Sequence, residues 1–213
     1  MKNVILIVCV WVVVALTSSA MAVNIETVTI LPTADGTTYY DDNVEQITAY
    51  TDGLAINAST ESNGNELRGA IEFNVSSVPP QLLSASLVLH IQHVSEFADA
   101  DYVPLLVYAY PGDGVISPGD FYARFDYEPF SQVEYRIAAV DMPTPAHDIF
   151  VEVDALPAIM FAQEQSWSYI GFMLRRESGE RVYIGSLESI PAELVYTTPE
   201  PATLSMLAIG GLA

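Results

Sequence analysis

The chain has 213 residues, of which 27 are Asp or Glu and only 7 are Lys or Arg, so its formal net charge is −20 at pH 7. This acidity argues against nucleic acid as a partner, because contacts to phosphates require a basic surface. The single cysteine excludes an intrachain disulfide, so burial of side chains has to stabilise the fold.

The N-terminus has the three-part layout of a secretory signal peptide. Lys2 precedes an apolar run at residues 4–16, and the small-residue sequence Ala20-Met21-Ala22 follows. The run is shorter than the roughly 20 apolar residues that a helix needs to cross a bilayer. We therefore expect residues 1–22 to direct the chain to the Sec translocon and to be cleaved after Ala22, which removes the only cysteine, Cys9.

The middle of the chain repeats apolar residues with a period of two, the pattern of strands with one buried face. Gly, Pro, Asn and Asp break these runs at intervals typical of an all-β sandwich. The pattern predicts about nine or ten strands and a jelly-roll-like β-sandwich that forms one domain at residues 23–197. We place strands at residues 25–30, 67–74, 87–92, 103–110, 133–140, 149–153, 169–174, 181–184 and 192–196.

One stretch has the spacing of a helix instead. Asp154 can act as an N-cap, and Pro157 is tolerated in a first helical turn. The residues that follow the helical spacing are Ala155, Leu156, Ile159, Met160 and Gln163. We expect one short helix that packs across one end of the sandwich.

Acidic residues gather in three of the predicted loops, where carboxylate and backbone oxygens could hold a hard cation such as calcium. None of the loops has EF-hand spacing, and Asp is also a common turn former, so solvated turn residues are the alternative interpretation. Structural calcium is thus left open, and no other cofactor is expected. The candidate metal ligands are Asp41, Asp42, Asp99, Asp101, Asp113 and Asp120.

Five aromatic residues lie in or beside predicted loops and could stack on sugar rings. Aromatic residues at strand ends also pack against the core, so packing is the alternative for each of them. The candidates for glycan contact are Tyr39, Tyr40, Tyr122, Tyr127 and Trp167.

No catalytic constellation is evident, and we expect no catalytic residues. The chain contains no Gly-x-Ser-x-Gly motif. His90 and His93 are three apart, and residues three apart on a strand point to opposite faces, so the two histidines cannot share a zinc ion without a bulge. With 27 acidic residues, the sequence alone does not select a pair of carboxylates for glycoside cleavage.

The C-terminal sequence 198–213 carries the most specific motif. Pro199-Glu200-Pro201 is followed by Ala-Thr-Leu and by a stretch rich in Leu, Ala and Gly. This resembles the PEP-CTERM sorting signal of bacteria that export proteins alongside exopolysaccharide. The resemblance implies that Pro199, Glu200 and Pro201 are recognised by an exosortase, a membrane cysteine peptidase, while the apolar tail holds the chain briefly in the inner membrane.

In that family an arginine cluster follows a complete membrane helix. A helix over residues 202–213 would span about 18 Å, less than the roughly 30 Å of the hydrocarbon core. We therefore expect the natural protein to extend beyond residue 213.

A second resemblance covers most of the middle of the chain. The sequence at 68–79 starts with Arg68 and ends in Ser-Ser-Val-Pro, and Ser-Ala-Ser-Leu-Val-Leu follows at 84–89. These segments, with later matches at 151–156, 169–174 and 184–196, resemble DNRLRE-type β-sandwich domains. The resemblance implies an extracellular jelly-roll module, although Glu72 occupies the position of an arginine in the family's Arg-Phe-Asp sequence.

These features predict an exported, non-catalytic protein of the cell surface or extracellular matrix, sorted by an exosortase and associated with exopolysaccharide. A carbohydrate-binding module with a defined ligand is the first alternative. A secreted polysaccharide lyase or hydrolase is the second, and it would need a cleft with paired carboxylates or a Tyr/His pair.

Overall fold

The computed structural model describes residues 25–51, 55–60, 64–94, 102–122, 135–176 and 179–199. The chain divides into two compact units, Thr27–Thr198 and the pair of terminal segments Met1–Glu26 and Pro199–Ala213. In the second unit the described residues are Ile25, Glu26 and Pro199. The core and the helix belong to the first unit.

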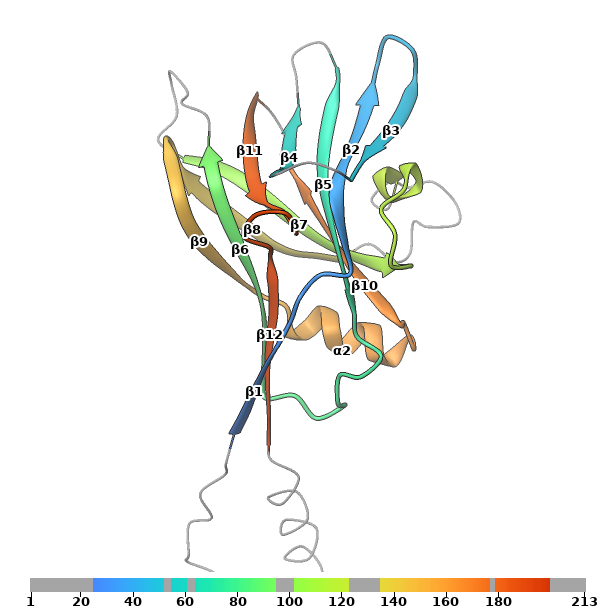
Figure 1. The fold of residues 1–213 in the computed structure, drawn as a ribbon, viewed down its shortest axis with the longest axis vertical. Helices are drawn as coiled ribbons and strands as arrows, with labels where there is room; N and C mark the ends of the chain where they lie inside the picture. Colours follow the sequence, from blue (N-terminus) through green and yellow to red (C-terminus); the bar gives the residue numbers. More distant parts are fainter. Residues whose placement is uncertain are drawn as a thin grey trace, which may run out of the picture. The chain divides into compact units, whose positions relative to one another are not determined.

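Twelve strands, one 3₁₀ helix and one α-helix make up the described chain (Figure 1). The strands are β1 (Ile25–Ile30), β2 (Ala34–Asp41), β3 (Gln46–Tyr50), β4 (Ala55–Thr60), β5 (Glu66–Asn74), β6 (Ser84–Val94), β7 (Tyr102–Gly112), β8 (Tyr135–Pro143), β9 (Ala146–Asp154), β10 (Tyr169–Arg175), β11 (Gly179–Gly185) and β12 (Glu193–Pro199). The helices are η1 (Pro118–Tyr122) and α2 (Leu156–Glu164).

The strands form one curled sheet in the order β1-β12-β6-β11-β4-β5-β10-β7-β8. Outside this order, β2 pairs with β3 and β5, and β9 pairs with β6. The pairings of β5 with β2 and β10, and of β6 with β9 and β12, are antiparallel. Apolar side chains from many of these strands meet in one large core, and β7 and β10 carry a second, smaller cluster made of Leu106, Tyr108, Tyr110 and Met173. The predicted all-β, sandwich-like fold class is therefore confirmed.

The core contains the apolar residues of β6 that alternate in the sequence, together with residues of β10. On β6, Leu87, Leu89 and Ile91 are fully buried, and on β10 Ile170 and Phe172 are buried opposite β5. Phe73 of β5 meets Phe172 edge to face, with the ring centroids 5.9 Å apart. The period of two thus identified the core residues of β6 correctly, whereas β5, β7 and β10 are buried on both faces.

The number of strands was underestimated, because β2, β3 and β4 were not recognised from sequence. Their sequences ADGTTYYD, QITAY and AINAST are rich in small and polar residues and lack a clear apolar row. β2 forms because it pairs with β5 over Ala34–Tyr40, and its residues 35–38 are buried there. Tertiary pairing, rather than local preference, makes these segments strands.

The predicted helix is present as α2, with Pro157 in its first turn. Ala155, not Asp154, occupies the N-cap position, but the Asp154 carboxylate accepts a hydrogen bond from the Leu156 backbone N–H at 3.0 Å. Ala158 and Ile159 are buried against the core, whereas Met160 is half exposed. No helix in the described part of the chain is long and apolar enough to span a membrane.

Candidate functional site

The segment resembling the sorting signal begins at the end of the last strand. Leu194 and Tyr196 of β12 belong to the core, and Thr197 pairs with Ser84 of β6. Pro199 ends the strand and has no N–H to donate to a neighbouring strand. The other two residues of the motif, Glu200 and Pro201, lie outside the described residues.

Two of the candidate metal ligands, Asp41 and Asp42, lie where β2 ends. Asp41 Oδ1 accepts hydrogen bonds from the backbone N–H of Asn43 at 2.9 Å and from its side chain at 3.1 Å. The backbone N–H of Asp42 donates to Asn65 Oδ1 at 3.0 Å. The geometry at Asp41 is that of an Asx turn, so this carboxylate organises the turn that connects β2 and β3.

Asp113 and Asp120 also make hydrogen bonds within their own loop. Asp113 Oδ1 accepts from the Val115 N–H at 2.9 Å, and Asp120 Oδ2 accepts from the Ser117 N–H at 2.6 Å. Burial raises the pKa of the Asp120 carboxyl. Nowhere in the described ranges do three or more His, Cys, Asp or Glu side chains form a group that could hold a metal ion. The remaining candidates, Asp99 and Asp101, lie outside those ranges.

The described aromatic candidates do not form a common surface. Tyr40 packs against Phe121 with the ring centroids 5.7 Å apart, and it is half-buried. Trp167 meets Phe161 edge to face at 5.6 Å and packs against the core next to α2. Tyr39 is half-buried on β2, whereas Tyr127 and the side chain of Tyr122 lie outside the described residues.

Sequence reasoning missed a row of buried charged residues on β5. Arg68 is fully buried, and its Nε and Nη2 atoms each donate to the Glu66 carboxylate at 2.9 Å. Its Nη1 donates to the Phe121 carbonyl, and its guanidinium carbon lies 4.0 Å from the centroid of the Phe121 ring. Arg175 of β10 donates to the same glutamate. Arg68 is therefore a structural residue in this fold.

Glu72, four residues along the same face of β5, is also fully buried. Its Oε2 atom accepts hydrogen bonds from the consecutive backbone N–H groups of Asp113, at 3.0 Å, and Gly114. Gly171 pairs with Glu72 on one side and with Tyr110 on the other. A Cβ at position 171 would overlap the Tyr110 ring, so the glycine is what allows this ring to lie across β10 beside Glu72.

Burial shifts the pKa values of both Glu72 and Tyr110. Burial raises the pKa of Glu72, and the charge of Asp120 raises it further. Burial also raises the pKa of Tyr110 well above its ordinary value. The two side chains also interact with each other, and the Glu72 side chain contributes to the raised pKa of Tyr110. A polymeric substrate cannot reach a carboxyl with no exposed surface, so the arrangement supports a structural role for Glu72.

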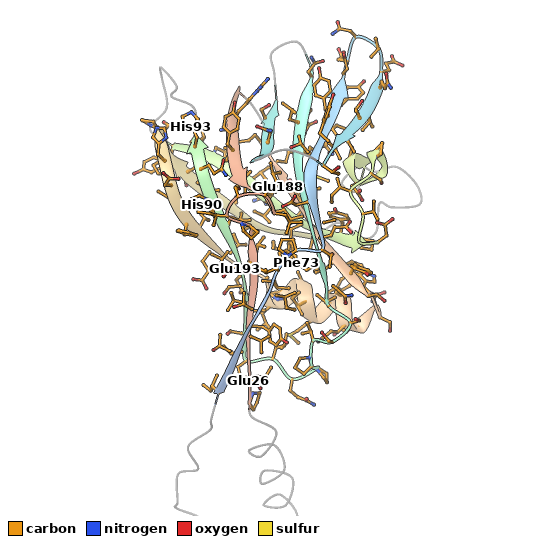
Figure 2. All side chains as sticks on the ribbon, viewed as in Figure 1. Glu26, Phe73, His90, His93, Glu188 and Glu193 are labelled. Atoms are coloured by element: carbon orange, nitrogen blue, oxygen red, sulfur yellow. The ribbon has the colours of Figure 1, made fainter. Side chains whose placement is uncertain are left out.

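The three histidines form two separate groups. His90 is buried beside Phe150, and its Nε2 atom lies 3.4 Å from the Asp148 carboxylate. Further along β6, His93 lies next to His147 of β9 (Figure 2 labels His90 and His93). The pairing of β6 with β11 shifts register between Ile91 and His93, so the regular alternation assumed for these histidines is broken.

Comparison with the models of known families and with curated proteins identifies no relative of this chain. None of the models of known protein families matches the chain. No curated protein is similar to it. The resemblances to the PEP-CTERM signal and to DNRLRE-type domains therefore stay predictions based on the residues quoted for them.

Proposed function

We propose that the chain is an exported, non-catalytic protein of the cell surface or extracellular matrix that an exosortase processes at Pro199-Glu200-Pro201. In this proposal the N-terminal signal peptide delivers the chain to the Sec translocon. The C-terminal segment holds it transiently in the inner membrane. The sandwich domain is then released or attached outside the cell, where it associates with exopolysaccharide.

The observation that carries the proposal is the position of the motif at the end of the sheet. The Leu83 N–H donates to the Thr197 carbonyl at 2.8 Å, and the hydroxyls of Ser84 and Thr197 are 2.7 Å apart. Pro199, two residues later, ends the strand. A peptidase must bind an extended backbone that is free of other pairing, and two prolines around Glu200 disfavour helix there. Tyr196, three residues before Pro199, belongs to the core, so cleavage at the motif would leave the core residues of β12 in the sandwich domain, which supports the proposal.

The surroundings of two carboxyls with raised pKa values support a non-catalytic role. Glu72 and Asp120 have carboxyls with raised pKa values, the kind of shift found in catalytic acids. Glu72 has no exposed surface, and Asp120 accepts the hydrogen bond that shapes the start of η1. The perturbed acids are therefore explained by enclosure and turn formation.

Replacing Glu200 tests the proposal directly. The full chain with its natural C-terminus is expressed in a bacterium that has the exosortase and in a strain from which that gene is deleted. We expect intact mass to show a shortened protein in the medium or at the cell surface only in the first strain. Glu200→Ala should remain unprocessed and fractionate with the inner membrane, because the motif that the peptidase recognises is lost.

Glu193→Ala is the matched control, because it removes the same charge from β12 outside the motif. This variant should be processed like the natural chain. Equal processing of Glu200→Ala and Glu193→Ala, or release that does not depend on the exosortase, would refute the proposal.

A further inference from the structure

β6 and β9 bring two histidines together that are far apart in the sequence. His93 and His147 are direct partners in the antiparallel pairing of these strands. Their Nδ1 atoms lie 3.2 Å apart, and the imidazole rings are 4.6 Å apart at their centroids with 23° between the ring planes. Both side chains lie outside the apolar core and are accessible to solvent.

Rings on the neighbouring strands restrict the orientation of the His93 imidazole. Tyr183 of β11 stacks on His93 with the ring centroids 5.7 Å apart and 28° between the planes. His147 contacts His93 from β9, so the His93 imidazole is packed against rings from both neighbouring strands. His90 does not take part, because it is buried against Phe150 and paired with Asp148.

The distance between the two nitrogens limits what can lie between them. A neutral imidazole carries one N–H and one lone pair, so an Nδ1 to Nδ1 contact of 3.2 Å accommodates a single shared proton. A metal ion can take the place of that proton. With metal–nitrogen distances of 2.0–2.1 Å, two ligand nitrogens lie about 3.3 Å apart in a tetrahedral site and about 2.9 Å apart in a square-planar site.

We propose that His93 and His147 bind one divalent transition-metal ion through their Nδ1 atoms, with water in the remaining positions. The 3.2 Å separation lies between the two ideal values. Imidazole nitrogen suits copper, nickel and zinc rather than calcium, and the Irving–Williams order places Cu²⁺ first among them. The net charge of −20 raises the local concentration of any cation at the surface. This site is independent of the proposed sorting function.

The test is a titration of the exported domain with Cu²⁺ in a buffer that does not coordinate copper. The protein must carry no polyhistidine tag, because its three natural histidines are to be compared with one another. Isothermal titration calorimetry gives the affinity, and electron paramagnetic resonance reports the nitrogens bound to Cu²⁺. We expect one Cu²⁺ per chain with two coordinated imidazole nitrogens.

Variants of the two ligands provide the decisive comparison. Loss of a group that merely supports a ligand weakens metal binding roughly 10–100-fold. His93→Asn and His147→Asn should therefore each weaken Cu²⁺ binding by more than about tenfold. His90→Asn is the matched control and should bind Cu²⁺ as the natural chain does. Circular dichroism checks that each variant is folded.

Three results would overturn the inference. The first is equal Cu²⁺ affinity in the natural chain and in the double variant of His93 and His147. The second is loss of binding in folded His90→Asn. The third is an electron paramagnetic resonance spectrum of the natural chain that shows fewer than two imidazole nitrogens bound to Cu²⁺. This result needs no variant, so it applies even if His90→Asn does not fold.

Discussion

Asp35, on β2, is a carboxylate that the fold encloses. Only 4% of its surface is exposed, and its Oδ2 atom accepts a hydrogen bond from the Leu187 N–H at 2.7 Å. Burial raises its pKa from 3.8 to about 6, and the nearby Glu188 charge contributes to the rise. The residue ties the loop between β11 and β12 to β2, but its charged form is disfavoured there.

The pKa shift makes a prediction about stability and pH. Because the folded state binds the proton more tightly than the unfolded state, the contribution of Asp35 is most favourable below pH 3.8 and is lost as the pH rises through 6. A shift from 3.8 to about 6 corresponds to a penalty of about 3 kcal/mol at neutral pH, at 1.36 kcal/mol per unit. Asp35→Asn keeps an acceptor for Leu187 and should be more stable than the natural protein at pH 7.

Urea denaturation at a series of pH values measures this effect. The advantage of Asp35→Asn should shrink as the pH falls from 7 to 4. Asp141→Asn, at an exposed position of β8, changes the net charge equally and should show no such trend. A constant difference between Asp35→Asn and the natural protein over this range would contradict the shifted pKa.

The burial of Arg68 and Glu72 could not be predicted from the sequence. Both follow the period of two that correctly assigns Ile71 and Phe73 to the core, so the sequence assigns them to the opposite face. That face would be solvated in a simple sandwich. Here the segment that contains Asp113, Gly114 and Phe121 covers that face of β5. The alternation of residues along one strand does not show whether another segment covers its outer face.

Among the elements, α2 was the easiest to predict, because its apolar spacing differs from that of every neighbouring strand. Gln163 uses its amide to donate to the carbonyls of Val78 and Pro79, at 3.2 and 2.9 Å. This ties the helix to the segment between β5 and β6. The first turn depends on the Asp154 carboxylate, which accepts the Leu156 N–H.

Removing that acceptor should weaken the helix and the domain with it. Loss of a side-chain acceptor at a helix N-terminus costs about 0.5–2 kcal/mol, and we expect Asp154→Ala to lower the free energy of unfolding by about 1 kcal/mol. Asp154→Asn retains an oxygen for Leu156 and should lose less than half as much. Equilibrium unfolding in urea separates the two, and equal losses would show that the hydrogen bond contributes nothing.

β2, β3 and β4 show why elements built on polar sequence are hard to predict. Thr38 of β2 is buried and donates to the Arg68 carbonyl at 3.4 Å, whereas Tyr50 of β3 is largely exposed. Neither strand presents a continuous apolar face. Their pairing partners decide their conformation, and those partners are distant in sequence.

At the scale of the whole molecule, the net charge of −20 acts against the compact state, because like charges approach one another on folding. Salt reduces this repulsion, since the Debye length falls from roughly 30 Å at 0.01 M to about 3 Å at 1 M. We therefore expect added NaCl to stabilise the sandwich domain by about 1 kcal/mol, or about 2–4 °C in Tm for a domain of this size.

Differential scanning calorimetry between 0.01 and 0.5 M NaCl checks this expectation. Sucrose at equal osmolality is the control for general solute effects, because it does not screen charge. A Tm that stays constant or falls with NaCl would mean that attractive pairs such as Arg68 with Glu66 outweigh the repulsion.

The sequence by itself determined the all-β class, the residues of β6 that enter the core, and the position of the helix. These follow from local periodicity, which reflects the geometry of a single element. The tertiary structure decided which polar residues are enclosed and which distant residues meet. Strand register and the segments that cover the sheet decide such contacts, and the pattern of one strand encodes neither the register nor the cover. Three contacts of this kind are the Glu66–Arg68–Arg175 cluster, Tyr110 beside Glu72, and His93 opposite His147.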